Sequence, residues 1–179
     1  MLAPYRCLVA VVKLLSLLHA PTNESVNVQG LLTGSDAQET DPGCYEIWSL
    51  PDWERAWGKY TTAPLLPGAD PRVKVVPDLQ GLPYVDFSSQ MVIALFGGLT
   101  SGVQSYQLLG CKVENHRVFI RFAPVSDGAS NSTKVLSNPY AFMVMNRIKL
   151  PFDVEMRVGF LNQLPVYRSL ASFAAPKAN

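Results

Sequence analysis

Apolar runs in the second half of the chain predict β-strands. Residues 91–96 are apolar without interruption and end at Gly97-Gly98, a pattern typical of a strand covered on both faces. Residues 105–113 and 117–123 flank a polar turn and therefore predict a β-hairpin, with alternate side chains of the second arm pointing into the core. Shorter apolar or alternating segments predict three more strands, at residues 44–48, 140–148 and 152–158.

One segment has the pattern of a helix. Ser49 can cap the free amides at its start, and Pro51 suits the first turn. Leu50, Trp53 and Trp57 are spaced so that they share one helical face. We therefore expect a short helix over residues 49–57 that packs on the sheet through these three side chains.

The order of these elements predicts a mainly β (α+β) fold. No internal repeat is found and helices do not alternate with strands, which argues against a βαβ fold. The chain has 179 residues, of which 48% are hydrophobic, so one domain is expected. We predict a single antiparallel β-sandwich or open barrel with one short packed helix at residues 44–158. Polar residues 21–43 are expected to be a linker or edge, residues 72–76 an edge strand, and residues 159–179 a frayed tail.

The start of the chain has the layout of an export signal. A basic residue, Arg6, precedes an apolar stretch that ends at Leu18-His19-Ala20, although Pro21 would hinder cleavage directly after Ala20. Residues 1–20 are therefore interpreted as a signal or leader, which predicts a periplasmic or secreted protein; a short buried helix is the alternative. The apolar stretch is interrupted by Lys13 and is shorter than the roughly 20 residues of a membrane span, so no membrane span is predicted.

Charge and cysteine content exclude several partners. Fifteen basic residues face fourteen acidic ones, so the chain has no net field for nucleic acid. The three cysteines form no C-x-x-C pair and have no histidine at ligand spacing, so no metal is expected. In an oxidising compartment Cys44 and Cys111 can form a disulfide if their strands are neighbours. Two buried thiols are the alternative.

No group of residues is arranged for catalysis. Cys111 and His116 would lie at opposite ends of a hairpin arm, without a third residue to orient the imidazole. Gly97-Gly98 is followed by neither the lysine nor the helix of a phosphate loop. We therefore expect no catalytic residues and no cofactor. A small hydrolase that uses Cys111 is kept as an alternative.

Three segments carry a resemblance to a known family. Residues 83–98 read PYVDFSSQMVIALFGG and resemble the V-D-F-S-x-x-M-V-I-A-x-F-x-G run of the PrcB C-terminal domain family. Residues 52–57 look like its W-x-x-x-W helix, and residues 135–140 look like its L-x-x-P-Y strand entry. Together the matches span roughly residues 44–155. The resemblance implies an exported accessory protein, similar to one that helps a secreted subtilisin-like protease complex assemble or remain stable, and it implies no catalytic residues.

The loop after the apolar strand is the expected binding site. The family usually has T-G-G-Y here, whereas residues 101–106 are longer and contain fewer glycines, so the partner is expected to differ. A turn held out by rigid strands suits contact with a protein, and an ordinary turn without function is the equal alternative. A protease inhibitor that presents this loop is the alternative, and the sequence does not indicate the oligomeric state. The expected contact residues are Gly97, Gly98, Ser101, Gly102, Gln104 and Tyr106.

Overall fold

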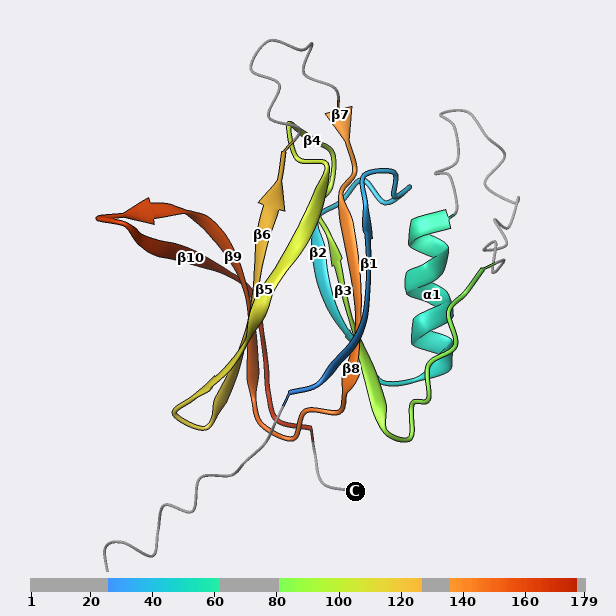
Figure 1. Ribbon diagram of the computed structural model, residues 1–179. Helices are drawn as coiled ribbons and strands as arrows, with labels where there is room; N and C mark the ends of the chain where they lie inside the picture. Colours follow the sequence, from blue (N-terminus) through green and yellow to red (C-terminus); the bar gives the residue numbers. More distant parts are fainter. Residues whose placement is uncertain (1–25, 62–80, 127–135, 177–179) are drawn as a thin grey trace, which may run out of the picture.

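The computed structural model describes residues 26–61, 81–126 and 136–176. The predicted leader and the predicted strand at residues 72–76 lie outside these ranges. Figure 1 shows the elements in sequence colours. They are β1 (Val28–Gly34), β2 (Gly43–Ile47), α1 (Leu50–Thr61), β3 (Gln90–Phe96), β4 (Thr100–Ser101), β5 (Ser105–Glu114), β6 (Arg117–Val125), β7 (Leu136–Ser137), β8 (Tyr140–Asn146), β9 (Phe152–Leu161) and β10 (Leu164–Phe173).

The strands form two four-stranded sheets that face each other. The first sheet has the order β1-β8-β3-β2 and the second sheet the order β10-β9-β6-β5, while β4 and β7 make a short separate ribbon. Neighbouring strands are antiparallel except for β6 and β9, which pair in parallel. The mainly β class is confirmed, and the arrangement is a sandwich rather than a closed barrel (Figure 1).

β3 carries the core on both of its faces, as its apolar run predicted. All six residues from Met91 to Phe96 are at most 3% exposed. Alternate residues on one face pack between the sheets, against Ile120 of β6 and Val154 of β9. Residues on the other face belong to a second cluster beneath α1. The hairpin prediction is also confirmed, since β5 and β6 pair around a turn at Asn115 and His116.

α1 covers the outer face of the first sheet, as the side-chain spacing predicted (Figure 1). The Ser49 hydroxyl oxygen accepts a hydrogen bond from the Asp52 amide at 3.4 Å, which caps the helix start. The ring centroids of Trp53 and Phe142 lie 4.9 Å apart in an edge-to-face contact, a favourable geometry for aromatic pairs. Leu50 was predicted to pack with Trp53, and this is wrong because its side chain is 51% exposed. Within the described residues, no helix is long and apolar enough to cross a membrane.

Both ends of the described chain are more ordered than the sequence suggested. The segment at residues 21–43, expected to be a linker or edge, contains β1, which pairs with β8 at the edge of the first sheet. The tail expected from residue 159 onward is wrong, because β9 continues to Leu161 and β10 returns antiparallel to it. The turn between them, Asn162-Gln163, has positive φ at both residues, as hairpin turns of this kind require.

Of the two states considered for Cys44 and Cys111, the structure has the free thiols and not the disulfide. Cys44 lies in β2 and Cys111 in β5, and both are free thiols. The prediction required these strands to be neighbours, but β2 is an edge of the first sheet and β5 an edge of the second. The alternative, two thiols packed against the core, describes the structure.

Candidate functional site

The predicted binding loop between β3 and β5 is firmly attached to its neighbours. The Gly97 amide donates to the Pro139 carbonyl at 2.8 Å, and the Gln104 amide donates to the Val125 carbonyl at 2.7 Å. In the middle of the loop, Thr100–Ser101 forms β4 and pairs with β7. These bonds hold the loop as a rigid rim at one end of the sandwich.

The six predicted contact residues divide into two groups. Ser101 and Gly102 are exposed at the turn, whereas Gly98 is buried and Gly97 and Gln104 are half-buried. Tyr106 is only 7% exposed, and its hydroxyl oxygen lies so close to Gly97 that a Cβ built on that glycine would be 2.1 Å from it. Gly97 therefore makes room for the Tyr106 hydroxyl, and only the turn at Ser101 and Gly102 faces solvent as expected.

A feature that sequence analysis missed lies opposite this loop. The distal halves of β9 and β10 form a hairpin that leans away from both sheets (Figure 1, left). We call residues 157–168 the arm. Phe160 is 63% exposed, Leu161 66% and Leu164 70%, and Val158 and Val166 are also exposed. Large apolar side chains thus cluster on a projecting element that no other described element covers.

The charge of the arm is one-sided. It contains Arg157 and Arg168 and no acidic residue. Arg157 lies over the Phe160 ring, 5.1 Å from its centroid. Within the described part of the chain, neither arginine forms an ion pair. By contrast, cations lower on the second sheet are paired, as in the 2.8 Å contact between Arg121 Nε and Glu155 Oε2.

A groove of about 350 Å³ separates the loop from the base of the arm. We call it the Arg168 groove. It opens between the two sheets, and apolar side chains make up much of its lining. The residues that carry the argument below are Gly97, Val103, Tyr106, Met156, Arg168 and Leu170.

Two polar groups meet in the Arg168 groove. Arg168 pairs with Met156 across the hairpin, so its side chain is on the same face as the core residue Met156. Burial raises the pKa of Tyr106, and the positive charge of Arg168 offsets part of that rise. The Tyr106 hydroxyl is therefore protonated at neutral pH and makes no hydrogen bond with the described residues. It is available as a donor in the same groove as the Arg168 side chain.

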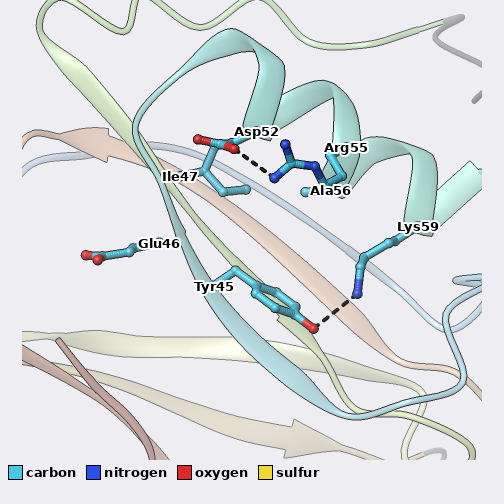
Figure 2. A pocket seen from close by; sticks show the side chains of 7 residues that line it. All are labelled: Tyr45, Glu46, Ile47, Asp52, Arg55, Ala56 and Lys59. Atoms are coloured by element: carbon cyan, nitrogen blue, oxygen red, sulfur yellow. Dashed lines mark hydrogen bonds and ion pairs between the residues drawn. The ribbon is translucent and has the colours of Figure 1, made fainter.

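A second, smaller hollow lies between α1 and β2 (Figure 2). Apart from Glu46, its charged groups are already paired within the chain. Lys59 Nζ lies 2.7 Å from Glu39 Oε2 and 3.1 Å from the Tyr45 hydroxyl, and Arg55 contacts Asp52 at 2.9 Å. Because these charges are satisfied within the chain, the hollow offers less to a ligand than the Arg168 groove does.

Comparisons of the chain with protein-family models, curated proteins and solved structures found no match. The evidence about function therefore comes from the chain itself.

The residues considered for catalysis are poorly suited to it. Burial raises the pKa of Cys111 to about 11, so the thiolate that a nucleophile needs is scarce at neutral pH. His116 is exposed in the β5–β6 turn. Among the described residues, no group of three or more His, Cys, Asp or Glu side chains could hold a metal ion. Arg168 and Tyr106, which line one groove, carry donor groups that suit an anion.

Proposed function

We propose that this protein is an exported, non-catalytic accessory protein that binds another protein through the arm and stabilises it. The partner is a secreted or periplasmic protease or another exported complex, in line with the resemblance to the PrcB C-terminal domain family. The observation that carries the proposal is the exposure of Phe160, Leu161 and Leu164 on an element that projects from the fold.

The energetics favour a covered arm. Removing one large apolar side chain from water contributes about 1.5–3 kcal/mol, so the three side chains together can contribute several kcal/mol to binding. Large apolar side chains exposed together mark interaction sites on soluble proteins, and Leu161 and Leu164 pair across the arm on one of its faces. The outer edge of β10 adds unpaired backbone groups to which a partner strand can bind.

A heterologous partner fits the arm better than a second copy of this chain. The arm carries two cations and no carboxylate, so two arms packed together would bring like charges into one interface. Charge complementarity instead requires a partner with acidic groups around an apolar surface.

Site-specific photo-crosslinking in the native host tests the proposal. A crosslinking amino acid at Leu161 should capture one defined protein, identified by mass spectrometry. The same amino acid at Lys112, exposed on β5, is the matched control and should not capture it. Leu161→Ser/Leu164→Ser should abolish binding to the purified partner. Because both positions are exposed, it should change the free energy of unfolding by no more than about 0.5 kcal/mol.

Three results would contradict the proposal. They are equal capture from both positions, a captured protein that binds the double variant normally, and a homodimer that the double variant dissolves. If the partner is a protease, sustained activity in the presence of the protein supports a stabilising role, whereas reduced activity identifies an inhibitor.

A further inference from the structure

We infer that the Arg168 groove binds an acidic side chain of the partner protein, with an apolar partner side chain packed beside it. This inference rests on the proposed function and specifies which chemistry of the partner is recognised. It follows from three properties of the groove: an unpaired cation, a neighbouring hydroxyl donor and an apolar lining.

The cation is the first property. Arg168 is attached to the core through its cross-strand partner Met156, which is buried, and its guanidinium has no carboxylate partner among the described residues. A guanidinium donates two parallel hydrogen bonds to a carboxylate, and such charge-assisted pairs are the stronger hydrogen bonds of proteins. The vacant partner position of Arg168 therefore fits a carboxylate.

The Tyr106 hydroxyl is the second property. Its position is fixed because it lies over Gly97, where any side chain would collide with it, and because the Tyr106 amide donates to the Thr33 hydroxyl at 3.0 Å. A positioned hydroxyl beside a guanidinium supplies a further donor to the same anion without the loss of side-chain freedom that a mobile group would incur.

The apolar lining is the third property. Val103, Met156 and Leu170 border the same groove and are partly or fully buried. This lining would not favour a small hydrated anion, but it favours a carboxylate that arrives with apolar neighbours.

The carboxylate of a partner protein can belong to an acidic side chain or to the chain terminus. The groove is continuous with the arm, and this continuity favours the side chain. The exposed apolar residues of the arm begin at Val158, also a lining residue of the groove, and continue to Leu164. A partner that covers the arm extends beyond the groove on that side. An acidic side chain within the partner's surface satisfies this continuity, whereas a chain terminus would end there.

Three peptide probes test the inference on the full-length, ¹⁵N-labelled protein by NMR. The first has blocked ends and one glutamate between two leucines, in glycine and serine flanks. The second has glutamine in place of the glutamate, and the third is the glutamine peptide with a free carboxyl terminus. The glutamate peptide should shift the Arg168 Nε–H signal and the Gly97 amide. The blocked glutamine peptide cannot form the charge-assisted bonds, so its affinity should be about tenfold or more lower than that of the glutamate peptide.

Matched variants locate the site. Arg168→Gln should lower the affinity for the glutamate peptide about tenfold or more, since it removes the charged donor. Arg55→Gln, which removes an exposed arginine of α1 that does not line the groove, should leave the affinity within about twofold. Tyr106→Phe should produce a smaller loss than Arg168→Gln, because a neutral donor contributes less than a charged one.

Each opposite result overturns the inference. These results are no shift with any peptide, equal affinity for the blocked glutamate and glutamine peptides, and unchanged affinity in Arg168→Gln. Equal or tighter binding of the free-terminus peptide would assign the groove to a chain end instead. The crosslinking experiment at Leu161 tests a position outside the groove. If crosslinking captures a partner but the glutamate and glutamine peptides bind equally, only the groove inference is rejected. If the glutamate peptide binds more tightly but crosslinking at Leu161 captures no protein, the proposal that the arm binds the partner is rejected.

Discussion

Replacing Gly97 with alanine probes the contact that fixes the Tyr106 hydroxyl. The new Cβ would lie 2.1 Å from Tyr106 Oη and 2.8 Å from Pro139 Cγ, so at least one of these side chains must shift. Overpacking of this kind costs about 1–3 kcal/mol. Gly97 does not have positive φ, so alanine fits the backbone and stabilises by about 0.4–1 kcal/mol through the unfolded chain. The expected net loss is therefore between about 0 and 2.6 kcal/mol, with a middle value of about 1.3 kcal/mol.

Urea denaturation measures this loss, with an unchanged dependence on denaturant. Gly30→Ala is the matched control, because a Cβ there meets nothing within 4 Å, and it should be neutral or slightly stabilising. In a Tyr106→Phe background the cost of Gly97→Ala should fall by about 0.5–1.5 kcal/mol, since the closest contact is gone. A cost that is the same in both backgrounds, or no larger than that of Gly30→Ala, would show that the hydroxyl does not occupy this position.

Three further predictions concern residues that are in the core or packed against it. Ile93→Ala should reduce the free energy of unfolding by about 2–5 kcal/mol in urea titrations, because Ile93 is buried between the sheets; Leu136→Ala, at an exposed position, is its control, and similar losses in both would refute the packing. Burial raises the pKa of Cys111 to about 11 from 9.0, so its alkylation at pH 8 should be about 100-fold slower in the native than in the unfolded protein. Burial also raises the pKa of Cys44, to about 12. As pH rises from about 9 the unfolded thiols ionise first, so the free energy of unfolding should fall, and Cys44→Ala should flatten the decline if the thiol causes it.

The sequence identified the elements whose burial leaves a pattern. β3 is buried on both faces, and its six apolar residues follow from that. β6 alternates because one of its faces lies on the core, and α1 shows a helical spacing of Trp53 and Trp57 for the same reason. In each case the burial of one face or of both faces imposed a readable order on the side chains.

The arm could not be identified in this way. Its apolar residues face solvent, so no alternation between a core face and a solvent face marks β10 as a strand. Its turn, Asn162-Gln163, lacks the glycine that usually signals a tight hairpin. The part of the candidate site that the arm contributes could therefore be recognised only from the structure. The loop half was predicted, but its attachment to Pro139 and Val125 depends on long-range pairing.

The parallel pairing of β6 with β9 has a consequence for how the chain folds. Among the strands that the structure describes, β1 pairs only with β8, β3 needs β8 to cover its second edge, and β6 needs β9 in the same way. Residues 140–161 therefore close both sheets at once. A chain still emerging from a ribosome would hold three unsatisfied strand edges until this segment arrives. Such long-range pairing is typical of slow, cooperative folding with a period of vulnerability to aggregation.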